Sequence, residues 1–77
     1  MSDGHPRSPI HDPEKLRRKR IEAGLNQMDV AAATGIQQSH ISRLECGASS
    51  TTPKSLARIA RALGCTIADL LPDRVAA

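Results

Sequence analysis

The sequence predicts an all-α protein, a compact bundle of five short helices. Two observations support this fold class. Apolar residues recur at spacings of three and four, and glycine or proline interrupts each such stretch. No segment alternates apolar and polar residues with the period of two that indicates a half-buried strand. The 77 residues include no Phe, Tyr or Trp, so aliphatic side chains must form the core, which favours short, closely packed helices.

Capping residues set the bounds of each predicted helix. For the first helix, Asp12 is a good N-cap, Pro13 suits the first helical position, and Glu14 favours the positive end of the helix dipole. The other predicted starts are Asn26 (with Asp29 completing a capping box), Gln37 or Gln38, Thr52 and Thr66, and the predicted stops are Gly24, Gly35, Gly47, Gly64 and Pro72.

We expect one domain with short ends. Residues 1–12 contain Gly and Pro and almost no apolar side chains, which predicts a disordered N-terminal arm. Residues 13–72 form the helical domain, and residues 73–77 form a short C-terminal tail. A four-helix core does not need Leu70, Leu71 or Val75, so these residues are candidates for a dimer surface.

Composition limits the classes of partner. The formal net charge is +3, and five of the six residues from Lys15 to Arg20 are basic, which is typical either of a solvated helix face or of a surface that faces phosphates. Readers of RNA and single-stranded nucleic acid often stack bases on aromatic side chains, which this chain lacks. The sequence therefore favours a duplex over a single strand.

Metal sites, cofactors and catalysis are not expected. Cys46 and Cys65 lie 19 residues apart without a CxxC pattern, His5 and His11 lie in the arm, and His40 stands alone. No Ser/His/Asp or Cys/His arrangement indicates an enzyme. Since the sequence shows no membrane-spanning run and no signal peptide, we expect a cytoplasmic protein with reduced thiols and no contact with a membrane.

The third helix displays the residues that carry the functional prediction. On a helical wheel at about 100° per residue, its polar side chains share an arc of about 140°, and its apolar side chains lie opposite. Gln forms paired hydrogen bonds with adenine and Arg with guanine, whereas Ser suits bases or phosphates. A short helix and a glycine turn precede this helix, as in units that insert a second helix into a major groove. The polar set is Gln38, Ser39, Ser42 and Arg43, and the apolar set is Ile41 and Leu44.

Two helix starts are candidate phosphate anchors. Gln27 lies in the first turn of the second helix, where free backbone amides favour an anion. Pro53 and Lys54 lie at the start of the fourth helix, so Lys54 and the first amides there form a second candidate clamp.

Three stretches carry a family resemblance: LRRKRIEAGLNQ at 16–27, TGIQQSHISRLECG at 34–47 and LARIARALGCTIADLL at 56–71. In them the sequence resembles the Cro/cI-type (XRE-type) helix-turn-helix family, with the motif at residues 27–46. The resemblance implies a lambda-repressor-like DNA-binding domain. It assigns phosphate binding to Gln27, and base or phosphate contacts to the polar set of the third helix. It also implies a structural ion pair between Arg20 and Glu45.

Some positions depart from the family pattern. Gln37 takes the capping position where Ser or Thr is common, which leaves open whether it also reaches DNA. Cys46 is either a tolerated small residue or a redox sensor, and Cys65 is expected as a buried thiol. His40 either packs, faces solvent or contacts a phosphate, and the arm is either inert or touches DNA through Arg7.

Together these observations predict a transcriptional regulator, such as a repressor, that binds specific double-stranded DNA. We expect a homodimer on a pseudo-palindromic operator, because one helix reads only a few base pairs. The alternative is a protein-interaction module, such as an antitoxin or anti-regulator, whose DNA binding is secondary. Salt-dependent duplex binding distinguishes the two.

Overall fold

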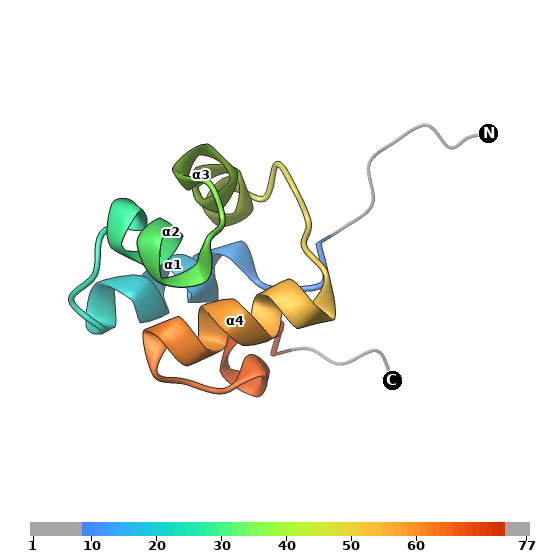
Figure 1. Ribbon diagram of the computed structural model, residues 1–77. Coiled ribbons are helices and arrows are strands. Elements are labelled where there is room, and N and C mark those ends of the chain that lie inside the picture. The colour runs from blue at the N-terminus through green and yellow to red at the C-terminus, as the bar shows by residue number, and fades with distance from the viewer. Residues whose placement is uncertain (1–8, 74–77) are drawn as a thin grey trace.

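The computed structural model describes residues 9–73, which form four α-helices and one short 3₁₀ helix (Figure 1). Within that range no residue lies in a strand, so the predicted all-α class is confirmed. The fifth predicted helix is a single 3₁₀ turn, because only four residues lie between its cap and the extended residue that follows. The elements are α1 (Pro13–Glu22), α2 (Gln27–Thr34), α3 (Gln38–Cys46), α4 (Pro53–Leu63) and the 3₁₀ helix η1 (Ile67–Leu70).

Four of these five elements begin at a residue whose side chain caps the helix. The Asp12 carboxylate accepts hydrogen bonds from the first amides of α1, and Thr52 does the same for α4. Asn26 begins α2 within the predicted capping box. A second capping box, which the sequence analysis did not predict, joins Thr66 and Asp69 at η1. The hydrogen bonds from the Thr66 backbone and side chain hold the pKa of Asp69 below its usual value.

The core lies between α1, α2, α4 and the inner face of α3. Helix α3 packs on α1 and α2, α4 packs on α2, and η1 closes the bundle against α1 and α4. In Figure 1, α3 lies at the top of the molecule and α4 in its lower half, with the red-orange segment that follows α4 below it. The buried apolar side chains are Leu16, Val30, Ile41, Leu44, Leu56, Ile59, Ala60, Leu63 and Leu70. Burial of each large aliphatic side chain contributes about 1.5–3 kcal/mol, so this core supplies the main stabilising term.

The ends of the domain differ from the sequence-based expectation. The predicted arm extended to Asp12, but His11 is 1% exposed and packs inside the molecule. Leu70, a candidate for the dimer surface, is 0% exposed and belongs to the core, whereas Leu71 is 36% exposed. The spacing of apolar residues in so short an element as η1 could not show which of its faces is buried. His5, Arg7 and Val75 lie outside the described residues.

Two kinds of feature are missing from residues 9–73. None of the helices there is long and apolar enough to cross a membrane. No group of three or more His, Cys, Asp or Glu side chains in this range is placed to hold a metal ion.

Candidate nucleic-acid interface

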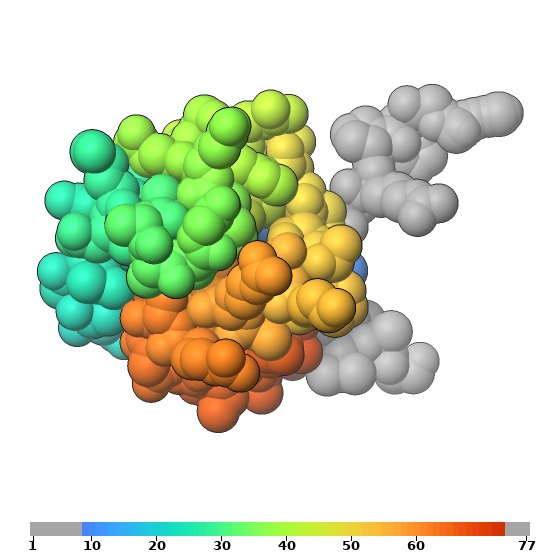
Figure 2. All heavy atoms as spheres, in the orientation of Figure 1, coloured from blue at the N-terminus to red at the C-terminus, as the bar shows by residue number. Residues whose placement is uncertain are grey.

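Helix α3 has one buried face and one exposed polar face. Ile41 and Leu44 are 1% and 0% exposed and hold the helix on the core. On the other side Gln38, Ser39 and Arg43 are exposed, and Ser42 is half-buried. These four residues are called the α3 stripe below. Figure 2 shows α2 and α3 forming one continuous surface at the upper face of the molecule.

Hydrogen bonds and a glycine define the turn between α2 and α3. Thr34 is 7% exposed; its hydroxyl donates to the Val30 carbonyl at 2.7 Å and accepts from the Ile36 amide at 3.2 Å. Gly35 follows with φ +78°, a left-handed conformation that favours glycine. Its amide donates to the Ala31 carbonyl at 2.8 Å, which ends α2. This turn sets the angle at which α3 leaves α2.

An ion pair joins α1 to α3, as the family resemblance implies. Arg20 Nε donates to Glu45 Oε2 at 2.6 Å and Arg20 Nη2 donates to Glu45 Oε1 at 3.0 Å. Arg20 Nη1 also donates to the Leu25 carbonyl at 2.9 Å. The two side chains are 13% and 4% exposed. The side-chain hydrogen bond and the negative charge of Glu45 raise the pKa of Arg20.

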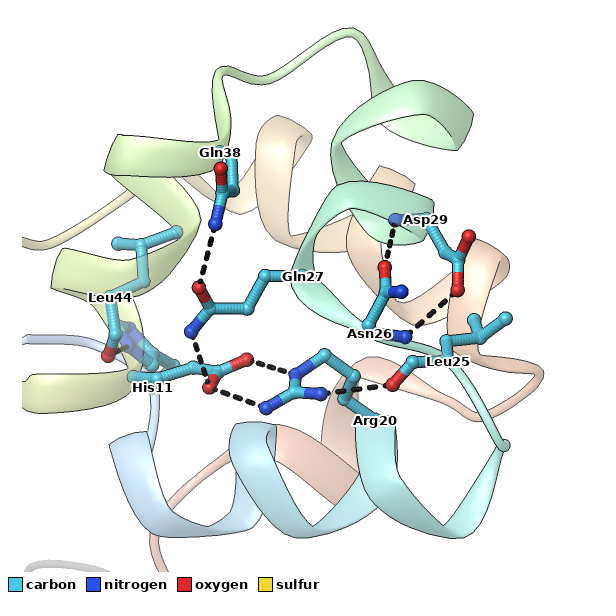
Figure 3. Close-up of polar contacts among 9 residues, drawn as sticks. His11, Arg20, Leu25, Asn26, Gln27, Asp29, Gln38 and Leu44 are labelled. Atoms are coloured by element: carbon cyan, nitrogen blue, oxygen red, sulfur yellow. Dashed lines mark hydrogen bonds and ion pairs between the residues drawn. The ribbon is translucent and has the colours of Figure 1, made fainter.

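Gln27 connects this ion pair to the α3 stripe. Its Nε2 donates to Glu45 Oε1 at 3.2 Å, and its Oε1 accepts from Gln38 Nε2 at 3.3 Å (Figure 3). Gln27 is half-buried at the start of α2, and Gln38 opens α3. The chain of contacts therefore runs from Arg20 to Gln38, the first residue of the α3 stripe.

The other predicted contact residues lie at helix starts. Gln37 occupies the N-cap position of α3 and is exposed, but its side chain makes no capping hydrogen bond. Lys54 is exposed in the first turn of α4, next to the Thr52 cap. Among the described residues, no hydrogen bond or ion pair connects Lys54 to the α3 stripe.

Most of the basic run on α1 has acidic partners. Lys15 pairs with Asp73, and Lys19 Nζ lies 3.5 Å from Glu22 Oε1. Beside them is an open hollow of about 420 Å³, lined mainly by basic and acidic side chains. These side chains are Lys15, Arg18, Lys19, Glu22, Asp69 and Asp73. Because the charges of this surface balance, its electrostatic attraction for phosphate is weak.

The remaining sulfur and imidazole groups lie in different environments. Cys46 is exposed at the end of α3, and His40 is half-buried. Cys65 is half-buried against the core rather than fully buried, and burial together with the negative charge of Asp69 raises the pKa of its thiol. His11, which the sequence analysis placed in the arm, donates from Nε2 to the Leu44 carbonyl of α3 at 2.9 Å. No local signal indicated this contact, since the two residues lie 33 positions apart.

The solved structures that resemble this chain include two gene-regulatory proteins and one further protein. The restriction-modification controller protein C.AhdI from Aeromonas hydrophila has 25% identity and a TM-score of 0.74, over 77% of this chain and 89% of its own. The clp gene regulator ClgR from C. glutamicum has 30% identity and a TM-score of 0.70, over 74% of each chain. HppE in its apo form has 25% identity and a TM-score of 0.76, over 86% of this chain but 37% of its own.

Among curated protein sequences there is no match. The model of the helix-turn-helix family HTH_3 matches residues 16–70, which span α1 to η1 and include the α3 stripe. The similarity therefore covers the whole helical core and the turn between α2 and α3. The chain belongs to the HTH_3 helix-turn-helix family.

Proposed function

We propose that this chain is a transcriptional regulator that binds specific double-stranded DNA by inserting α3 into the major groove. The observation that carries the proposal is the α3 stripe: amide, hydroxyl and guanidinium groups face outward from a helix whose other face is buried. An α-helix fits the major groove of B-DNA, where each base pair presents a distinct pattern of donors and acceptors.

In the proposed complex, Gln38, Ser39 and Arg43 read base edges. The contact between Gln38 and Gln27 supports this role, because an amide held in one direction loses less conformational entropy on binding. Arg43 is exposed and takes part in no ion pair among residues 9–73, so its guanidinium is available for the O6 and N7 atoms of a guanine. Ser42 contacts either a base or a nearby phosphate.

The proposed phosphate anchors lie at the N-termini of two helices. Gln27 sits at the N-terminus of α2, where helix amides and the helix dipole favour an anion. Lys54 sits at the N-terminus of α4 and adds a positive charge to a second such end. Phosphate contacts of this kind position the protein on the duplex without reading its sequence.

The comparisons favour regulation over catalysis. C.AhdI is a restriction-modification controller and ClgR is a clp gene regulator, and this chain matches about three quarters or more of each. HppE has been described with Fe(II) and substrate, but this chain corresponds to about a third of that protein. We therefore propose no enzymatic activity for the helical domain.

Selection of bound duplexes from a random pool tests the proposal. We expect one preferred sequence, with log K falling linearly as log[salt] rises. Arg43→Ala should weaken binding to that sequence by about 1–3 kcal/mol and relax the preference at one base pair. Gln27→Ala should weaken binding to all sequences and, because it also releases Gln38, relax the preference at the base pair that Gln38 reads.

The matched control is Arg61→Ala, which removes the same charge from an exposed position in the last turn of α4. It should leave the base preference unchanged. If Arg43→Ala preserves the preference, the assignment of base reading to Arg43 is wrong. If duplex binding is absent or barely depends on salt, a protein-interaction module is the better description.

A further inference from the structure

Residues Ile10 to Pro13 close over the C-terminal end of α3. The Ile10 amide donates to Ser50 Oγ at 3.3 Å, and the Asp12 amide donates to the Leu70 carbonyl at 2.8 Å. A Cβ on Gly47 would lie 3.4 Å from Cγ of Pro13, so the ring packs directly on the turn that ends α3. We call residues 10–13 the N-terminal clasp. They precede the residues that the family model matches.

His11 is the buried centre of the clasp. Its side chain is 1% exposed, and its Nε2 lies 2.9 Å from the Leu44 carbonyl. A carbonyl oxygen only accepts hydrogen bonds, so Nε2 carries the hydrogen. The other ring nitrogen, Nδ1, is buried without a hydrogen-bond partner in the described part of the chain. Burying a polar atom without a partner costs free energy. An apolar side chain would avoid this cost, so packing alone does not explain a histidine at position 11.

The Leu44 carbonyl needs such a donor. Leu44 lies in the last turn of α3, where carbonyls lack the amide of a following turn. The Ala48 amide, four residues on, donates to the Arg43 carbonyl instead, and the Gly47 amide reaches Leu44 only at 3.3 Å. His11 therefore supplies the shortest hydrogen bond to this carbonyl and completes the end of α3 from a distant part of the chain.

We propose that His11 is a positioning residue for DNA reading. Arg43, at the end of the α3 stripe, directly precedes Leu44, and residues 48–52 lead from α3 to Lys54 at the start of α4. The clasp holds the last turn of α3 through His11 and the following loop through Ile10. It therefore holds the end of α3 that carries Arg43 and the chain segment that leads to the α4 anchor. This inference rests on the proposed function.

Two substitutions distinguish the hydrogen bond from packing. In Gln the terminal amide nitrogen lies about where Nε2 of His lies, so His11→Gln can still donate to Leu44. In Asn the terminal amide reaches only the position of Nδ1, which has no partner here. We expect His11→Asn to lower affinity for the selected duplex about three- to tenfold, the equivalent of one hydrogen bond. His11→Gln should stay within about twofold of the wild type.

The decisive measurement is the ratio of specific to non-specific duplex affinity, taken where circular dichroism shows each variant fully folded. A loss of folded protein lowers both affinities together and leaves their ratio unchanged. A misplaced Arg43 lowers the specific affinity alone and reduces the ratio. Equal effects of the Asn and Gln variants, or an unchanged ratio in His11→Asn, would overturn the proposal.

Two further arms complete the design. If His11→Asn does not fold, Ser50→Ala, at an exposed position, removes the side-chain acceptor of Ile10. An unchanged ratio in that variant also overturns the proposal. If the wild-type chain binds no duplex, the proposed function fails by itself. Amide exchange of Gly47 and Ala48 then reports whether His11 holds the end of α3: faster exchange in the Asn variant than in the Gln variant is expected, and equal rates contradict it.

Discussion

Glu45 is the residue on which the contacts of three helices converge. It accepts two hydrogen bonds from Arg20 of α1 and one from Gln27 of α2, while it belongs to α3. Its side chain is only 4% exposed. Removal of one partner of a buried ion pair leaves an uncompensated charge, which costs more than the pair itself contributes.

Glu45→Leu should destabilise the fold by about 3 kcal/mol, because the Arg20 guanidinium is left without a counter-charge. The double variant Arg20→Met with Glu45→Leu should recover part of that loss, since no buried charge remains. Urea unfolding of the wild type, both single variants and the double variant measures the coupling. Losses that simply add in the double variant would contradict this account.

The residues of the site differ in how far sequence could predict them. The family resemblance predicted the ion pair of Arg20 and Glu45. Helical periodicity predicted the exposed side chains of α3. The clasp contact of His11 could not be predicted, because its partner is the backbone carbonyl of a residue 33 positions later. Backbone carbonyls leave no signature in a sequence, and the prolines around His11 indicated an irregular segment.

At the scale of elements, local chemistry accounts for the success of the predicted bounds. An N-cap side chain binds the first turn of α1, α2, α4 and η1, and α2, α3 and α4 end on a glycine with positive φ. These signals act over three or four residues and can be read without knowing the fold. The burial of Leu70 depends on which elements cover η1, which periodicity does not show.

Helix α3 is the one α-helix whose start lacks a side-chain cap among those described. Gln37 already has the extended backbone of an N-cap residue, with φ −63° and ψ 144°. Gln37→Ser should therefore raise stability by about 1 kcal/mol, because the hydroxyl can accept from a first-turn amide of α3. In thermal unfolding this corresponds to about 5 °C in Tm for a domain of this size.

The matched control for this prediction removes an existing cap. Thr52 Oγ1 accepts from the Ser55 amide at 3.1 Å, so Thr52→Ala should lower stability by about 1 kcal/mol.

The same Gln37→Ser protein also settles whether Gln37 reaches DNA. Unchanged duplex affinity assigns Gln37 to the helix start alone, whereas weaker binding by a more stable protein assigns it a contact. No rise in Tm would show that α3 gains nothing from a cap.

At the scale of the molecule, the elements that form most of the core differ from the helix that carries the exposed polar face. Helices α1 and α4 with η1 supply most of the core, whereas α3 uses Ile41 and Leu44 to pack and directs its other face outward. The basic run on α1 lies among carboxylates, so the net charge of +3 does not form a single phosphate-binding face there. In general, a single helix in the major groove reads only a few base pairs, which is too little to specify an operator.

The whole-molecule prediction is that two copies bind one pseudo-palindromic operator. Half-site centres about 34 Å apart, one turn of B-DNA, place both α3 helices on the same side of the duplex. Inserting about five base pairs moves the half-sites to opposite sides and should abolish tight binding, whereas about ten base pairs should restore part of it. Titrations with sedimentation measurements give affinity and stoichiometry for each spacing. Binding to an isolated half-site as tight as binding to the full operator, or indifference to the five-base-pair insertion, would show that the chain acts as a monomer.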